Sequence, residues 1–173
     1  MSEKGGVSTF LWVEQSVCDR MAKQRFFIDL LALEAQTGAD KAMFTAVSCV
    51  GYWRHSALHT AISHVYRIEN VEYHDQRERE GAVALVYMRS MLTMQDWIGN
   101  APMQDNVKLV LVAESDCFEA VVQEFGDSVD IEVYTDNPRI VMALASKKGM
   151  GHEFSYHTLQ DLPQREPERK EAR

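Results

Sequence analysis

The sequence predicts an α/β fold, built as a three-layer sandwich with a mostly parallel central sheet. The strongest observation is the segment 107–113, an apolar run rich in Val and Leu that is typical of a strand buried on both faces. From this segment onward, expected strands alternate with expected helices, an order that implies βαβ crossovers between parallel strands. A length of 173 residues suits one domain with a substantial core.

The composition is that of a folded and acidic protein. Hydrophobic residues make up 46% of the chain and charged residues 25%, which are globular values. The formal net charge is −8. Because a protein that binds nucleic acid on its own normally presents a basic face, this charge disfavours nonspecific duplex binding.

Cysteine usage and hydropathy indicate an intracellular protein, whether in the cytoplasm, the nucleus or an organelle matrix. Cys18, Cys49 and Cys117 are far apart and form no C-x-x-C pair, which argues against a disulfide framework. No apolar segment is long enough to cross a membrane, and the first residues lack the apolar core of a secretion signal. We therefore expect no membrane association.

The first part of the chain predicts a helical extension over residues 1–24, ahead of an α/β domain at 25–162. Phe10, Val13, Val17 and Met21 recur at helical spacing. The segment 25–33 fits either a continuation of this helix or a buried strand that carries Asp29. Its periodicity does not decide between the two, because the apolar run is short.

The remaining elements follow from apolar patterning and from turn residues. Gly and Asp residues break the chain at 37–40, and Gly126 ends an amphipathic helix. Pro138 stands at the favoured first position of a late helix. The expected strands are 42–52, 71–73, 107–113, 128–135 and 153–159; the expected helices are 54–67, 82–97, 117–125 and 138–148; residues 163–173 are expected to be a disordered charged tail.

Four carboxylates are candidates for a metal site. If Asp29 lies on the first strand, then Asp29, Glu114, Asp116 and Asp136 all fall near the carboxyl ends of strands, where open α/β sheets bind ligands. Clustered carboxylates are the ligands that Mg²⁺ and Mn²⁺ prefer. Such ions activate water and stabilise phosphodiester transition states.

Helix capping is the alternative explanation for the same carboxylates. Asp116 followed by Glu119 fits a capping box at the start of the helix 117–125. Asp136 or Asn137, just before Pro138, is a suitable N-cap for the next helix.

The order of elements resembles the NYN/PIN-like ribonuclease domains, a Rossmannoid family related in fold to flap nucleases, over residues 25–160. Phe27-Ile28-Asp29 matches the family's first-strand Asp. The segment 113–118, Ala-Glu-Ser-Asp-Cys-Phe, stands where the family has Gly-Asp-Ser-Asp-Phe. Glu114 therefore replaces the first Asp of that motif. Glu80 lies near the acidic position of the middle helix, which this chain has otherwise lost.

The resemblance implies a domain in RNA metabolism that acts within a complex, with metal-dependent ribonuclease activity reduced or lost. It assigns catalysis to Asp29, Glu114 and Asp116 and metal binding to the same residues with Asp136, leaving Glu80 as an outer candidate. The cofactor is Mg²⁺ or Mn²⁺ if the domain is active, and none otherwise. Protein partners and RNA are the implied binding partners.

Two further patterns are open to a functional or a structural interpretation. His55 and His59 are four residues apart, a spacing that zinc-binding helices use, but the hydrolytic glutamate is missing between them. Met88, Met91, Met94 and Trp97 on the helix 82–97 fit either a core or a partner-binding face.

Two alternative functions remain beside the nuclease lineage. The chain could be a non-catalytic assembly subunit without any RNA role, as its acidic charge and its methionine-rich helix would allow. It could also be a small-molecule-binding domain of flavodoxin-like layout that uses the same edge of the sheet. Whether the chain is an enzyme stays open at this point.

Overall fold

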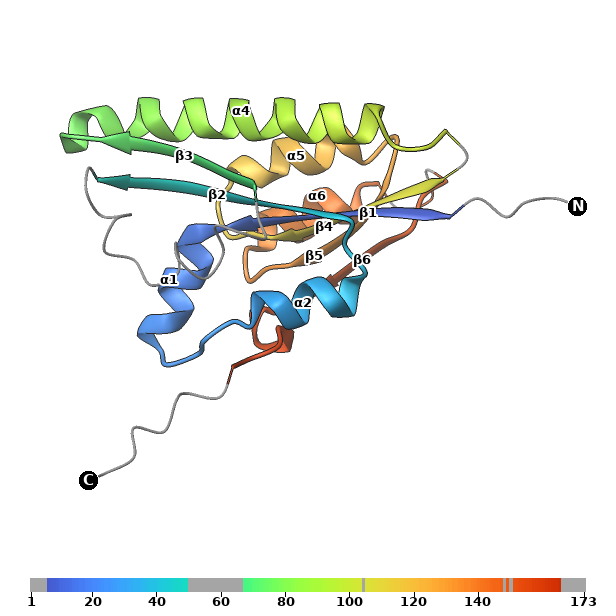
Figure 1. Cartoon of the computed structure of the whole chain (residues 1–173), viewed down its shortest axis with the longest axis horizontal. Helices are drawn as coiled ribbons and strands as arrows, with labels where there is room; N and C mark the ends of the chain where they lie inside the picture. The colour runs from blue at the N-terminus through green and yellow to red at the C-terminus, as the bar shows by residue number, and fades with distance from the viewer. Residues whose placement is uncertain (1–5, 50–66, 104, 148, 150, 166–173) are drawn as a thin grey trace, which may run out of the picture.

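The computed structural model describes residues 6–49, 67–103, 105–147, 149 and 151–165, and shows a Rossmann-like α/β fold. The described residues form a six-stranded sheet in the order β3-β2-β1-β4-β5-β6, and every pair of neighbouring strands is parallel (Figure 1). The strands are β1 (Val7–Glu14), β2 (Lys41–Cys49), β3 (Arg67–Tyr73), β4 (Asn106–Val112), β5 (Asp130–Tyr134) and β6 (Phe154–His157).

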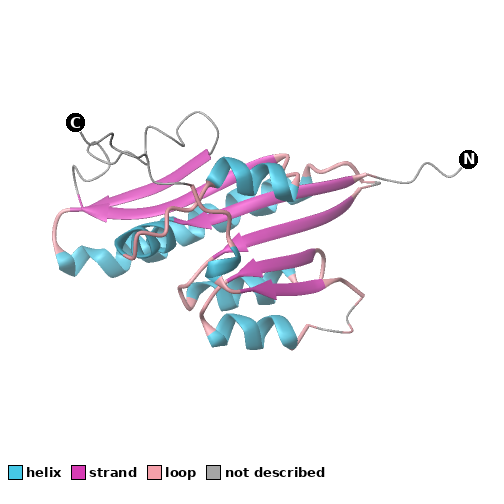
Figure 2. Ribbon diagram, turned by 90° about the horizontal axis from the view of Figure 1, so that it is seen from below, coloured by secondary structure: helices cyan, strands magenta, loops and turns pink. Residues whose placement is uncertain are grey.

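Helices cover both faces of the sheet, which confirms the expected three layers (Figures 1 and 2). One face packs against α1 (Gln15–Lys23) and α2 (Leu30–Thr37). The opposite face packs against α4 (Arg79–Gly99), α5 (Cys117–Phe125) and α6 (Pro138–Ala145). Two short 3-10 turns complete the described elements, η2 (Gln76–Glu78) and η3 (Leu159–Asp161).

The central strands contribute side chains to the cores on both faces. On β1, Leu11 and Val13 point toward α1 and α2, whereas Phe10 and Trp12 point toward α4 and α5. β4 also contributes side chains to the cores on both faces, and its residues from Leu109 to Val112 are all fully buried. This confirms the prediction that the apolar run around residue 110 is a strand buried on both faces.

The helical extension predicted for residues 1–24 is wrong over residues 7–14. Residues Val7–Glu14 form β1, the strand between β2 and β4, and only Gln15–Lys23 are helical. The helical spacing of Phe10, Val13 and Val17 was misleading because a strand buried on both faces has apolar residues at nearly every position, and such a run carries no distinctive period.

The segment 25–33 is neither a strand nor a continuation of α1. Asp29 is the N-cap of α2, where its side chain accepts a 3.0 Å hydrogen bond from the backbone N–H of Ala32. An isolated antiparallel bridge joins Ile28 to Gln164. Residues 163–165 are therefore tied to the domain and do not belong to a disordered tail, while 166–173 lie outside the described residues.

The expected elements of the second half match the structure closely. The helix predicted at 82–97 lies within α4, and the boundaries of α5 coincide with those expected. The predicted helix 54–67, with His55 and His59, lies outside the described residues except for its last residue, Arg67, which begins β3. No helix in the described ranges combines the length and apolarity that a membrane span requires.

The strand order places a topological switch point between β1 and β4. The chain moves outward from β1 through β2 to β3 and then returns to the other side of β1 to form β4. This is a Rossmann-like order and not the flavodoxin-like one that we considered as an alternative layout. Because the helices after the two strands diverge, the carboxyl ends of β1 and β4 are the favoured ligand site in such sheets.

Candidate functional site

A cavity of about 550 Å³ opens at the carboxyl ends of β1 and β4. Its walls come from the start of α1, the middle of β2, the first turns of α4 and the turn after β4. The polar side chains used below that line it are those of Glu14, Ser16, Arg20, Thr45, Arg79, Tyr87, Glu114 and Ser115. The cavity therefore lies at the switch point of the sheet.

Glu14, the last residue of β1, is a buried carboxyl group at this cavity, with 5% of its surface exposed. Its Oε1 accepts hydrogen bonds from the backbone N–H groups of Glu114, at 2.8 Å, and Ser115, at 3.0 Å. The hydroxyl of Tyr87 contacts the other oxygen, Oε2.

Burial raises the pKa of Glu14 to about 7, an effect that outweighs its two backbone hydrogen bonds, which lower it. The negative charge of Glu114 raises this pKa slightly further. Glu14 therefore gains and loses its proton near neutral pH. At lower pH it is mostly protonated, and its O–H group can then donate a hydrogen bond.

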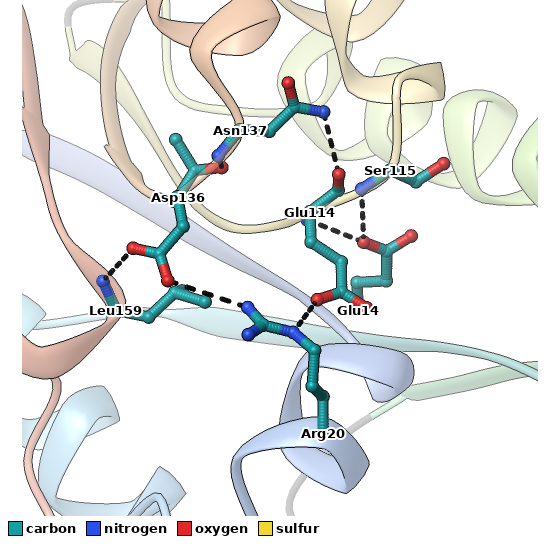
Figure 3. A network of polar contacts seen from close by, with 8 residues as sticks. Glu14, Arg20, Glu114, Ser115, Asp136, Asn137 and Leu159 are labelled. Atoms are coloured by element: carbon teal, nitrogen blue, oxygen red, sulfur yellow. Dashed lines mark hydrogen bonds and ion pairs between the residues drawn. The ribbon is translucent and has the colours of Figure 1, made fainter.

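Arg20 of α1 lies between two of the carboxylates that the sequence singled out (Figure 3). Its Nε is 2.5 Å from Oε2 of Glu114, and its Nη2 is 3.6 Å from Oδ2 of Asp136. The hydrogen bond to Glu114 is the main reason why the pKa of Arg20 is raised above its ordinary value. The other oxygen of Asp136 accepts a 3.2 Å hydrogen bond from the backbone N–H of Leu159.

Asp116 belongs to a neighbouring surface cluster and does not line the cavity. It accepts hydrogen bonds from Nδ2 of Asn137, at 2.8 Å, and from Nη1 of Arg139, at 3.2 Å. The bond from Asn137 is the largest cause of its lowered pKa, and the charge of Arg139 acts in the same direction. The expected capping role is not observed, because the Asp116 side chain makes no cap hydrogen bond to α5.

Of the two N-cap candidates that the sequence offered for α6, Asp136 and Asn137, the structure has Asn137 in that role. Its Oδ1 accepts a 2.9 Å hydrogen bond from the backbone N–H of Arg139, and Pro138 follows it at the first position of α6. Its Nδ2 also donates to the backbone carbonyl of Glu114 at 2.8 Å. Asn137 therefore holds together the segments that follow β4 and β5.

The expected four-carboxylate metal site is not assembled in the described part of the chain. Asp29 caps α2, Asp116 faces Arg139, and the pair Glu114 and Asp136 flanks Arg20. Glu80 is exposed on the first turn of α4. No group of three or more His, Cys, Asp or Glu side chains among the described residues is arranged to hold a metal ion. These residues therefore do not fit Mg²⁺ or Mn²⁺.

Sequence reasoning did not identify four residues that line the cavity, namely Glu14, Arg20, Arg79 and Tyr87. One of them carried a usable signal. Glu14 ends an apolar run at residues 10–13, just as Glu114 follows the run at 107–113. Both are acidic residues directly after a buried strand, but the run before Glu14 was interpreted as a helix.

The arrangement can bind and exchange protons, and it has the features of an anion site more than of a cation site. The guanidinium of Arg20 already neutralises Glu114, and burial raises the pKa of Glu14 to about 7. The chain matches no protein-family model, and searches of curated proteins and of solved structures likewise produced no match.

Proposed function

We propose that this chain is a PIN/NYN-like domain that acts in RNA metabolism as a non-cleaving member of a complex. We infer the loss of cleavage from the position of Arg20. Its Nε lies 2.5 Å from Oε2 of Glu114, and its Nη2 lies 3.6 Å from Oδ2 of Asp136. A protein cation stands there between two carboxylates, in the role that a divalent ion has in a metal-dependent nuclease.

The electrostatics of the cavity support this proposal. A divalent ion would have to displace the Arg20 guanidinium, which has no other carboxylate partner among the described residues. Glu14 would have to lose a proton that it holds up to a pH of about 7 before it could bind a metal. Both requirements weaken metal binding under neutral conditions.

The likeness to the PIN/NYN-like family rests on the topology and on the late motif. The all-parallel sheet and the acidic turn after β4 are compatible with it. In this structure the acidic residue at the end of the first strand is Glu14, so Glu14 replaces Asp29 as the counterpart of the family's first-strand Asp.

A role within a complex is supported by the outer face of α4. Met88 and Leu92 are 56% and 59% exposed, and they lie four residues apart on one side of the helix. Exposed Met and Leu side chains are frequent at adaptable interfaces. Since the chain has a net charge of −8, we propose that it reaches RNA mainly through a protein partner.

The proposal is tested by incubating the full chain with Mn²⁺ or Mg²⁺ and a labelled single-stranded RNA. We expect no cleavage, and no Mn²⁺ binding heat in calorimetry for the natural chain. Arg20→Met should gain Mn²⁺ affinity at least about tenfold, because Glu114 and Asp136 lose their cation. Lys23→Met, which removes an exposed charge from the same helix, is the matched control and should gain none.

Metal-dependent cleavage by the natural chain that Glu114→Gln abolishes would overturn the non-cleaving role. A separate measurement addresses RNA: the complex isolated with this chain should contain RNA that nuclease treatment releases. A complex without RNA would favour the alternative of an assembly subunit with no RNA role.

A further inference from the structure

Within the described part of the chain, one arginine side chain at the switch-point cavity has no hydrogen-bond or ion-pair partner. Arg20 is held by Glu114, but the side chain of Arg79, which lines the same cavity, makes no hydrogen bond or ion pair with any described residue. Glu14, the other carboxyl group in the lining, is already satisfied by two backbone N–H groups and the Tyr87 hydroxyl. When Glu14 is protonated, the charged side chains of the described lining therefore carry one more positive than negative charge, and an anion would balance it.

Hydroxyl groups and an uncapped helix start lie beside this charge. Ser16 and Ser115 line the cavity, and each can donate a hydrogen bond to an anion. Ser16 belongs to the first turn of α1, which has no side-chain cap and no acidic residue. The partial positive charge at the start of a helix adds to that of Arg79.

The rest of the lining is apolar and suits an organic group. Val47 of β2 and Val83 of α4 line the cavity together with Tyr87. A volume of about 550 Å³ falls within the range of about 300–1,000 Å³ that is usual for small-molecule sites. Inorganic phosphate alone would leave most of this space unfilled.

We infer that this cavity binds a small phosphate monoester, with its phosphate on Arg79 and the hydroxyl groups of Ser16 and Ser115, and its organic part against Val47, Val83 and Tyr87. A phosphate group fits better than a cation because a guanidinium repels cations and matches phosphate oxygens with its forked donors. The switch point of a Rossmann-like sheet is where such ligands bind. This inference goes beyond the proposed function and does not depend on it.

Protonation of Glu14 also favours phosphate binding in this cavity. A carboxylate at the floor of the cavity would repel phosphate, but the raised pKa of Glu14, about 7, keeps much of this group neutral near physiological pH. The other charged groups around the cavity are Glu114, which is paired with Arg20, and Arg79. Anion binding should therefore weaken as the pH rises above 7, because Glu14 then becomes charged.

The test is calorimetry on the full chain at pH 6.5 with three probes: 5′-AMP, adenosine and inorganic phosphate. We expect 5′-AMP to bind at least about tenfold more tightly than adenosine, because only the former carries a phosphate, and more tightly than inorganic phosphate, because only the former fills the apolar part. Binding of inorganic phosphate that is equal to that of 5′-AMP would overturn the monoester assignment.

Two variants of α4 locate the site. Arg79→Gln should weaken 5′-AMP binding at least about tenfold, whereas Arg89→Gln, which removes an exposed arginine farther along the same helix, should leave it unchanged. Because Arg79 is exposed, thermal melts without ligand should show that both variants are folded. The inference is wrong if 5′-AMP does not bind at about 10 mM, or if Arg79→Gln binds it as well as the natural chain does.

Discussion

Glu14 and Glu114 meet across the switch point of the sheet, where the Glu14 carboxyl accepts a 2.8 Å hydrogen bond from the backbone N–H of Glu114. The two residues are 100 positions apart in the chain, yet they follow neighbouring strands, β1 and β4. The Ser115 N–H donates to the same oxygen at 3.0 Å. One buried carboxyl group thus links the end of β1 to the turn after β4.

Replacing Glu14 by Gln should make the protein relatively more stable as the pH rises. The pKa of Glu14 is about 7 in the folded chain against 4.5 for the free group, so folding favours the protonated form. Its stabilising contribution is complete below pH 4.5 and is lost as the pH rises through 7. Gln keeps an acceptor for the two backbone N–H groups and a donor for Tyr87, and it does not titrate.

Urea unfolding at pH 5 and at pH 8 measures this effect. The difference in free energy of unfolding between Glu14→Gln and the natural chain should grow by up to about 3 kcal/mol over this range, since each pKa unit corresponds to about 1.4 kcal/mol. Glu124→Gln changes an exposed carboxylate and should follow the profile of the natural chain. Parallel profiles for Glu14→Gln and the natural chain would show that Glu14 does not titrate near neutral pH.

Asp29 is a helix cap, and its variants should separate capping from metal binding. Asp29→Ala should lower the free energy of unfolding by about 1 kcal/mol, because the backbone N–H of Ala32 loses its 3.0 Å acceptor. Asp29→Asn keeps a capping oxygen and should cost only a few tenths of a kcal/mol. Chemical denaturation measures both. A loss in Asp29→Asn as large as in Asp29→Ala would mean that the charge matters, contrary to a capping role.

A buried chain of hydrogen bonds joins β1, β2 and α4 through Thr45, which also lines the cavity. The Trp12 Nε1–H donates to Thr45 Oγ1 at 2.7 Å, and this oxygen lies 2.8 Å from Ser90 Oγ. Thr45→Val should cost about 2–3 kcal/mol, because it leaves two buried polar groups unpaired. Ser90→Ala should cost about 1 kcal/mol, since Thr45 still accepts from Trp12. Equal losses in the two variants, measured by urea unfolding, would contradict this order.

The sequence predicted the class of fold and most of the second half because those elements have strong local signals. The run around residue 110 is followed by Glu114 and Ser115, and Pro138 and Gly126 mark helix boundaries that the structure confirms. The N-terminal half lacked such marks. β1 passes into α1 without a Gly or Pro between them, so the change from strand to helix left no local trace.

The candidate site was only partly predictable for a related reason. Glu114 was recognised because it follows a clear strand, but its partner Arg20 lies 94 residues away on a helix whose start was misplaced. Charges on distant elements meet only once the strand order is known. Without that order, four acidic residues suggested a metal site, whereas the fold brings arginines to three of them, Glu114, Asp116 and Asp136.

Met88 and Leu92 form an exposed apolar patch on the outer face of α4. Leu92→Glu places a charge in the exposed apolar patch formed by Met88 and Leu92, and it should weaken the association with the partner at least about tenfold. The fold should tolerate the change within about 0.5 kcal/mol, because Leu92 is mostly exposed. Gln95→Glu is the matched control, since it adds the same charge to an exposed position one turn away without removing an apolar side chain.

The measurement is the apparent size of the tagged chain in gel filtration of extracts from the cells that make it. The natural chain and Gln95→Glu should elute together in a large complex, whereas Leu92→Glu should shift to the size of the free chain. Urea unfolding of the purified variants should show that Leu92→Glu is still folded, so that the shift reports a lost contact. Elution of all three proteins in the same complex would show that the partner binds elsewhere, and elution of all three as free monomers would argue against a role in a complex.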